Sequence, residues 1–235
     1  MSAIAQPLIF WLLLGSGLNA SFNPPGVTEE TSYIEYFYPG IIALALLFTA
    51  IFATISIVQD CREGFLQGVL VAPVSRWVIV LGQALGGTTL ALFQGALLLF
   101  LAPIVGVPLS PFSVFSALGV MLIVSFGLTN LGLLIAWRMD STQGFHAIMN
   151  LILIPIWLLS GAFFPVSGVP VLLEWAMKLN PLTYGVAALR RCLYFNAPIV
   201  AEEIPQLTLS LCVTGLFCVA TYFSAARTAR RPNVA

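Results

Sequence analysis

Few residues in this sequence could do chemistry, and they do not gather into a catalytic motif. Asp60 and Glu63 form a close acidic pair, and two carboxylates in one loop could serve acid–base or metal chemistry. No Asp-rich motif accompanies them, and the single histidine, His146, is distant in the sequence. An enzyme that uses this pair is therefore an alternative interpretation and not the leading one.

The sequence also lacks the usual means of using ATP. A phosphate-binding loop has the pattern Gly-x-x-x-x-Gly-Lys-Ser/Thr, whereas the only lysine, Lys178, lies between Met177 and Leu179. The four cysteines are scattered and suggest no metal site or disulfide framework. We therefore expect this chain to bind no cofactor or metal, so that any step driven by ATP and magnesium would take place on another polypeptide.

The composition is that of an integral membrane protein. Of 235 residues, 60% are hydrophobic and 8% are charged, and the mean hydropathy is +1.01. Soluble domains carry roughly 25% charged residues. Nine Lys and Arg balance nine Asp and Glu, which leaves no basic face for a nucleic acid. The fold class expected is a single all-α transmembrane domain over residues 1–235.

Stretches without charge divide the chain into six predicted spans. A spanning helix needs about 20 mostly apolar residues. The stretch from Trp77 to Trp137 has no Asp, Glu, Lys or Arg but contains Pro103, Gly106, Pro108 and Pro111, which split it into two helices. The predicted spans are approximately 4–20, 39–58, 77–102, 113–136, 144–163 and 205–226.

The first of these spans has a second interpretation. Residues 4–18 are apolar but few, and Asn19-Ala20-Ser21 offers the small residues of a signal-peptide cleavage site. A signal peptide begins with basic residues, and the first ten residues contain none. A retained span is therefore favoured over a secretory signal peptide.

The distribution of basic residues predicts the orientation. Cytoplasmic loops carry an excess of Lys and Arg. With both termini on one side, that side carries Arg62, Arg76, Arg138, Arg227, Arg230 and Arg231. The other side carries only Lys178, Arg190 and Arg191. We therefore expect a protein of the cytoplasmic (inner) membrane with both termini in the cytoplasm.

The polar residues inside the predicted spans are neutral. Gln94, Asn130 and Asn150 could join helices through hydrogen bonds or could line a substrate path, and the sequence leaves both interpretations open. Gly82 and Gly86 form a Gly-x-x-x-Gly pair expected at a helix-packing contact. Proton relays need embedded charges, so a gradient-driven carrier or channel is a lesser alternative, as is a lipid-modifying intramembrane enzyme.

Two loops carry amphipathic patterns. In the loop 60–76, apolar residues follow a helical spacing, which suits either docking to a cytoplasmic partner or burial in lipid headgroups. The second loop predicts a helix over 171–179, a break at Asn180-Pro181 and another helix from Pro181. We predict that these two helices are interfacial or re-entrant. We expect Arg190 to anchor them to headgroups or to the acidic residues near 202–203.

Several motifs in these loops occur in a characteristic order. They are Tyr38-Pro39-Gly40, Arg62-Glu63-Gly64, Ala72-Pro73-Val74-Ser75-Arg76, Leu81-Gly82, Ser160-Gly161-Ala162-Phe163-Phe164-Pro165, and Asn180-Pro181-Leu182-Thr183-Tyr184 through Arg190. Over about residues 33–195 the chain resembles permease subunits of type 2 ATP-binding-cassette (ABC) transporters, in particular the daunorubicin-resistance and nodulation-export-like group. Members usually carry an amphipathic interfacial helix before the first span, whereas here Met1 stands almost at that span.

The resemblance implies a six-span permease of an ATP-driven exporter that moves an amphiphilic or lipid-linked substrate or a drug outward. It would pair with a second copy or a sister permease and with two cytoplasmic ATPase subunits that use ATP and magnesium. The ATPase-coupling residues implied are Asp60, Arg62, Glu63, Gly64, Phe65, Pro73 and Arg76. The residues implied for an extracytoplasmic re-entrant hairpin over 165–200 are Asn180, Pro181, Tyr184 and Arg190.

Overall fold

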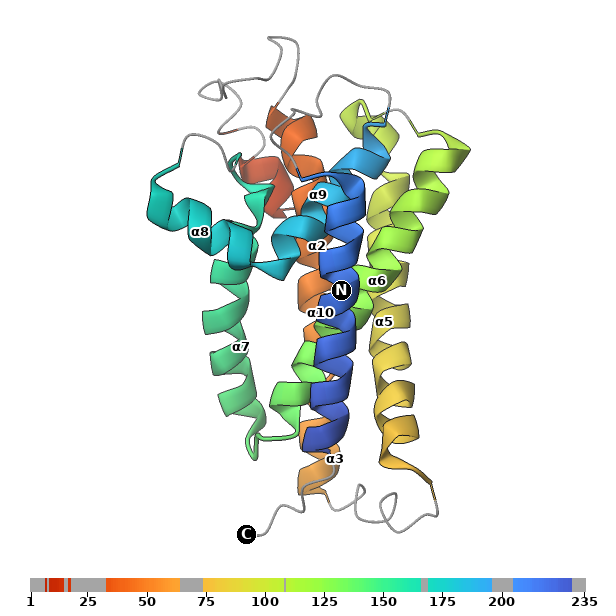
Figure 1. The fold of residues 1–235 in the computed structure, drawn as a ribbon, viewed down its shortest axis with the longest axis vertical. Helices are drawn as coiled ribbons and strands as arrows, with labels where there is room; N and C mark the ends of the chain where they lie inside the picture. Colours follow the sequence, from red (N-terminus) through yellow and green to blue (C-terminus); the bar gives the residue numbers. More distant parts are fainter. Residues whose placement is uncertain are drawn as a thin grey trace.

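The computed structural model describes residues 7, 9–14, 17, 33–63, 74–107, 109–165, 169–195 and 205–229. Throughout these residues the regular structure is helical (Figure 1). The elements are α2 Tyr33–Phe52, α3 Ile55–Arg62, α5 Arg76–Phe100, the 3₁₀ turn η2 Ala102–Val105, α6 Pro111–Ala136, α7 Thr142–Trp157, the π-helical turn η3 Leu158–Ala162, α8 Val171–Leu179, α9 Pro181–Leu193 and α10 Leu207–Thr228. The all-α fold expected from composition is confirmed.

Five helices in the described ranges are long and apolar enough to cross a membrane. They cover Tyr33–Asp60, Arg76–Ile104, Pro111–Ala136, Thr142–Ala162 and Leu207–Thr228. Each overlaps one predicted span, and the last begins two residues later than expected because Gln206 is its N-cap. Of the predicted first span, residues 7, 9–14 and 17 are described, and they are helical.

The prediction that the second span begins at Pro39-Gly40 was wrong. Helix α2 starts six residues earlier, at Tyr33, and runs through Pro39. A proline inside a helix leaves the carbonyl four residues before it without its usual donor, which here is the carbonyl of Glu35. The hydroxyl of Tyr194 donates to that oxygen at 2.7 Å. A residue 159 positions away thus allows the helix to continue.

Helix α2 is the centre of the bundle. It packs against α5, α6, α7, α9 and η3, and most of its side chains are buried on every side. Figure 1 shows α7 standing apart on one side of α2, with α5 and α6 on the other and α10 across the front. We call the end of the bundle that holds α9 the α9 end, and the opposite end, where α3 lies, the α3 end.

Glycine allows α5 and α6 to approach closely, although not at the predicted pair. A Cβ atom built on Gly87 would lie 2.6 Å from the side-chain methyl of Thr129. Gly82 and Gly86 have no atom within 4 Å of such a Cβ among the residues described. The predicted Gly-x-x-x-Gly pair therefore lies on an open face of α5, and the internal crossing uses the neighbouring glycine.

The crossing predicts opposite outcomes at adjacent glycines. Gly87→Leu should lower the free energy of unfolding by about 1–3 kcal/mol, because the new side chain enters a filled contact. Gly86→Leu should leave it nearly unchanged, because its Cβ meets open space. Equilibrium unfolding of the detergent-solubilised protein, followed by tryptophan fluorescence, measures both. Equal losses at the two positions would contradict this packing.

Candidate functional site

The most elaborate polar arrangement lies at the α9 end, around the end of α7. Helix α7 contains Pro155 and passes into the turn η3, where Gly161 adopts a left-handed φ of +72°. Only glycine takes this conformation without strain. Such a break leaves backbone carbonyls without helical donors, and inside a membrane these groups need other partners. We call the backbone carbonyls of η3 and of the residues beside it, together with the side chains that donate to them, the carbonyl hub.

Donors from α2 bind one side of the carbonyl hub. The hydroxyl of Tyr36 donates to the carbonyl of Gly161 at 3.3 Å, and that of Tyr33 donates to the carbonyl of Phe163 at 3.3 Å. In return the indole Nε1 of Trp157 donates to the carbonyl of Gly40 at 2.9 Å. Gly40 itself lies against Ala162, since a Cβ built on it would be 2.5 Å from the Ala162 Cβ. Helix α2 and the turn are therefore joined closely.

The corner between α8 and α9 binds the other side of the carbonyl hub. The amide Nδ2 of Asn180 donates to the carbonyl of Ile156 at 2.6 Å, while its Oδ1 accepts from the backbone N–H of Leu182 at 3.0 Å. The hydroxyl of Thr183 reaches the carbonyl of Leu159 at 3.2 Å. Asn180 thus caps α9 and fastens it to α7, and the predicted break at Asn180-Pro181 is confirmed.

Arg190 points into this arrangement and not toward headgroups. The residue is 4% exposed, and its Nη2 donates to the carbonyls of Tyr36 and Gly161, each at 3.2 Å. The guanidinium lies 4.0 Å from the centre of the Tyr36 ring, a cation–π contact. Its Nε has no hydrogen-bond partner among the residues described. Carbonyl dipoles and an aromatic face therefore stabilise the buried charge. The predicted anchoring to headgroups was wrong, and the alternative partners near 202–203 lie outside the described residues.

Two further side chains complete the α9 end. Tyr194, which donates to the Glu35 carbonyl left free by Pro39, is buried. Burial raises the pKa of its hydroxyl, and Glu35 adds to the rise. The group therefore stays protonated and able to donate. The hydroxyl of Tyr184 donates to the carbonyl of Lys178 at the end of α8, at 3.0 Å. Of the residues predicted for the hairpin, Asn180, Tyr184 and Arg190 thus donate to backbone carbonyls, and Pro181 begins α9.

The predicted coupling residues lie at the α3 end, and the structure describes them in part. Asp60 and Arg62 belong to α3 and Glu63 caps it, exposed. Gly64, Phe65 and Pro73 lie outside the described residues. Arg76 begins α5, and its Nη1 donates to the carbonyl of Ala229 at 2.9 Å, just beyond the end of α10. Arg76 therefore ties the end of the coupling segment to α10.

The three residues predicted for a substrate path do not come together. Gln94 is buried and accepts a hydrogen bond from the Thr49 hydroxyl at 2.9 Å. Asn130 is also buried and donates to the carbonyl of Phe126 at 2.8 Å. Asn150 lies on the exposed face of α7. The first two amides thus lie between helices of one chain, and only Asn150 faces outward.

Sequence reasoning missed the connections that hold this site together. Tyr194 donates to the carbonyl of Glu35, 159 positions away in the sequence. Arg76 donates to the carbonyl of Ala229, 153 positions away. Pro39 and Pro155 inside apolar stretches were the available signal, because each marks a carbonyl that needs a donor from elsewhere. No three His, Cys, Asp or Glu residues come together within the described ranges.

Asn180 offers a graded test of the carbonyl hub. Asn180→Ala removes both the α9 cap and the bond to Ile156, and we expect it to cost about 2–4 kcal/mol of unfolding free energy. Asn180→Ser keeps a capping oxygen but is too short to reach Ile156, so it should cost about half as much. Chemical unfolding of the purified protein measures both, and equal costs would contradict the double role.

Tyr194 and Pro39 should be energetically coupled. Tyr194→Phe leaves the Glu35 carbonyl without a donor and should cost about 1–3 kcal/mol of unfolding free energy. In a Pro39→Ala background the restored backbone N–H can serve the same oxygen, so the cost of Tyr194→Phe should fall below about 1 kcal/mol. A double-mutant cycle on unfolding free energies measures the coupling, and additive costs would show that the two residues act separately.

Comparison with known proteins places this architecture in a family. Residues 1–194 match the family described as ABC-2 type transporter. The chain is 28% identical to transport permease ycf38 of Cyanophora paradoxa over 81% of its own length and 66% of the relative's. It is 27% identical to Nodulation protein J of Rhizobium leguminosarum bv. trifolii over 89% of its length and 78% of the relative's.

A third relative has a more specific name. The chain is 28% identical to the multidrug ABC transporter permease YbhR of Escherichia coli over 69% of its length and 43% of the relative's. The chain spans 66% of the length of the ycf38 relatives it matches. The extent of the family match is decisive: this chain belongs to the ABC-2 type transporter family, and its five apolar helices are those of a multi-pass membrane protein.

Proposed function

We propose that this chain is the membrane-spanning subunit of an ATP-driven exporter, powered by cytoplasmic ATPase subunits. The observation that carries the proposal, beside family membership, is where the charges lie. In the five spans every charged residue is within three positions of an end: Glu35, Asp60, Arg76 and Arg227. A span without a central charge offers no proton relay, so the motive force comes from a partner.

The exposed face of α7 supports pairing with a second copy of the permease. Asn150, Leu151 and Ile154 are exposed there. An amide at this depth would cost several kcal/mol of free energy if it faced lipid without a hydrogen-bond partner. A second copy, or a sister permease, that brings its own α7 to this face supplies such partners. The substrate path then runs between the two subunits, with Asn150 as one lining residue.

The α3 end is arranged to receive movement from an ATPase. Helix α2 passes into α3 through Ala53 and Thr54, where the Thr54 N–H bonds to the Ile51 carbonyl at 3.0 Å, three residues back. The coupling segment 60–76 follows, and Arg76 connects its other end to α10. An ATPase that displaces this segment would therefore move the central helix and α10 together. Under this proposal the α3 end faces the cytoplasm.

The proposed direction is outward and the proposed cargo is amphiphilic. In this orientation the α9 end lies outside the cytoplasm, so that α8 and α9 form the extracytoplasmic hairpin. Residues 4–20 form a sixth span in this proposal. Helix α8 suits a membrane interface, because Leu172, Trp175 and Leu179 are exposed while Lys178 and Glu174 pair at 2.5 Å. Spans without central charges suit drugs or lipid-linked molecules. The name of the multidrug relative agrees with drugs as cargo.

The coupling segment supplies the test of the proposed function. Replacing both Arg62 and Glu63 by alanine should lower ATP-dependent uptake of a fluorescent amphiphile into inside-out vesicles at least tenfold, because the ATPase loses its contact. The matched control is Arg138→Ala, which removes an exposed charge from the turn between α6 and α7 at the same end and should preserve uptake.

Two outcomes would contradict the proposal. Uptake unchanged by the double substitution would remove Arg62 and Glu63 from coupling. Uptake by the purified chain alone, reconstituted without any ATPase subunit, would show that transport needs no partner. Co-purification of the wild-type chain with an ATP-hydrolysing subunit, with ATPase activity lowered in the double variant, is the expected result.

A further inference from the structure

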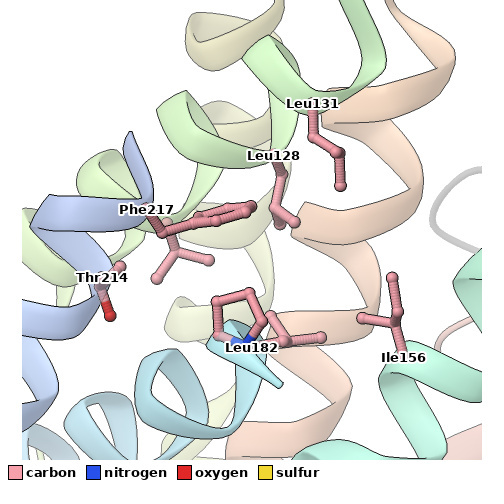
Figure 2. A pocket seen from close by; sticks show the side chains of 8 residues that line it. Leu128, Leu131, Ile156, Leu182, Thr214 and Phe217 are labelled. Carbon is pink, nitrogen blue, oxygen red and sulfur yellow. The ribbon is translucent and has the colours of Figure 1, made fainter. Parts of the chain in front are cut away.

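The outward face of α10 changes its chemistry along the helix. On the inward face, Figure 2 shows the ring of Phe217 directed into the bundle, toward Leu128 of α6. The outward face carries Val219 and Phe223, which are 53% and 47% exposed, and then Arg227, which is also exposed. These three residues follow one another at intervals of four and therefore form one stripe of the helix, which ends in a positive charge at the α3 end.

The first turns of α5 lie beside this stripe. The ring of Trp77 meets that of Phe223 edge-on, with 5.4 Å between their centroids. The carbonyl of Trp77 accepts a hydrogen bond from the Tyr222 hydroxyl at 3.2 Å. Leu81, one turn further along α5, is 37% exposed. The aromatic rings thus join the two helices, and Leu81 and Val219 extend the apolar surface from these rings toward the middle of the spans.

Two guanidinium groups stand at the α3 end of this surface. Arg76 directly precedes Trp77, and its Nη1 donates to the carbonyl of Ala229, two positions beyond Arg227. Among the residues described, this is the only hydrogen bond that either guanidinium makes. Because each guanidinium has five N–H donors, most of them stay available to a ligand. We call this set of residues the α5–α10 seam: Arg76, Trp77, Leu81, Val219, Phe223 and Arg227.

The seam carries no acidic residue to balance these charges. Neither α5 nor α10 contains Asp or Glu. The acidic residues described at the α3 end are Asp60, Glu63 and Asp140, which belong to α3, to its cap and to the turn before α7. Helix α3 packs against α6 and α7. The one ion pair among the residues described joins Lys178 to Glu174, on α8. The seam therefore complements an anion.

The order of the groups along the seam matches a phospholipid. Arginine binds phosphate through paired N–H donors, and aromatic rings lie at the level of lipid headgroups. Below the rings, the exposed apolar side chains suit an acyl chain. A soluble anion would contact the arginines alone and would leave the apolar part of the seam without a partner. The continuity of charge, rings and apolar surface therefore favours a lipid.

We propose that the α5–α10 seam binds an anionic phospholipid, with its headgroup at Arg76 and Arg227 and one acyl chain along Leu81 and Val219. The choice of leaflet rests on the proposed function, which places the α3 end at the cytoplasm, where anionic lipids are concentrated. The headgroup joins the start of α5 to the end of α10, beside the Arg76 bond to Ala229. The lipid thus holds the end of the coupling segment 60–76 at the membrane surface.

Photoreactive lipids of two charges test the proposal. The permease, co-expressed with its ATPase, is reconstituted in phosphatidylcholine vesicles that contain a trace of photoreactive phosphatidylglycerol or of photoreactive phosphatidylcholine. Both probes carry a diazirine at the acyl carbon nearest the headgroup, and adducts are mapped by mass spectrometry. Adducts on Trp77 and Phe223 should be at least about tenfold more abundant with the anionic probe, because two arginines attract it. Adducts on Phe115, which is 75% exposed toward the α9 end, should not depend on the charge of the probe.

Three variants connect this preference to the seam. Arg227→Gln removes one charge and should lower the anionic adducts about fivefold, the usual contribution of one basic residue at a membrane surface. Arg227→Lys keeps the charge and should retain most of the adducts. Arg138→Gln is the matched control, because it removes an exposed arginine at the same end, in the turn between α6 and α7. It should leave the seam adducts unchanged.

Three outcomes would overturn the proposal. The first is equal labelling of the seam by the two probes, and the second is an equal loss of adducts in Arg227→Gln and Arg138→Gln. The third is a seam that neither probe labels while Phe115 is labelled, which would show that a protein such as the ATPase covers it. Labelling needs neither ATP nor cargo, so this proposal and the proposal of ATP-driven export can fail separately.

Discussion

The structure depends on one constraint: inside a membrane, every backbone group released by a break in a helix needs a partner from elsewhere in the protein. Pro39 removes one backbone hydrogen bond from α2, and the chain leaves the helical conformation at Gly161 and at Asn180, all toward the α9 end. Donors from distant segments serve the carbonyls so released, Tyr194 at the first break and Tyr36 and Arg190 at the second. Because each donor comes from a different segment than the carbonyl that it serves, satisfying the backbone also determines how α2, α7 and α9 pack.

The same constraint explains why the two ends of the bundle differ. At the α9 end, side-chain hydrogen bonds to carbonyls join three helices around η3. At the α3 end the described links are fewer, chiefly the Arg76 bond to Ala229 and the packing of α3 against α6 and α7. Helix α2 connects the two ends and continues through Ala53 and Thr54 into α3. A central helix that joins both ends agrees with the proposed coupling.

Much of the fold could be predicted because its signals are local. Charges cannot stand at the middle of a span, so their positions predicted five of the helices that the structure describes. The pair Asn180-Pro181 predicted the break between α8 and α9 for an equally local reason, the steric effect of proline on the residue before it. The same kind of argument failed at Pro39, where it predicted that the helix begins. Its effect on α2 depends on Tyr194, which no local pattern connects to it.

The sequence by itself determined that this is an all-helical membrane protein and where its long helices lie, because hydropathy and charge act residue by residue. Only the tertiary structure decided which polar groups meet. It buried Arg190 against Tyr36, placed Gln94 and Asn130 between helices and left Asn150 outside. Those outcomes depend on the rotation of each helix about its axis, which is decided by packing across the whole bundle.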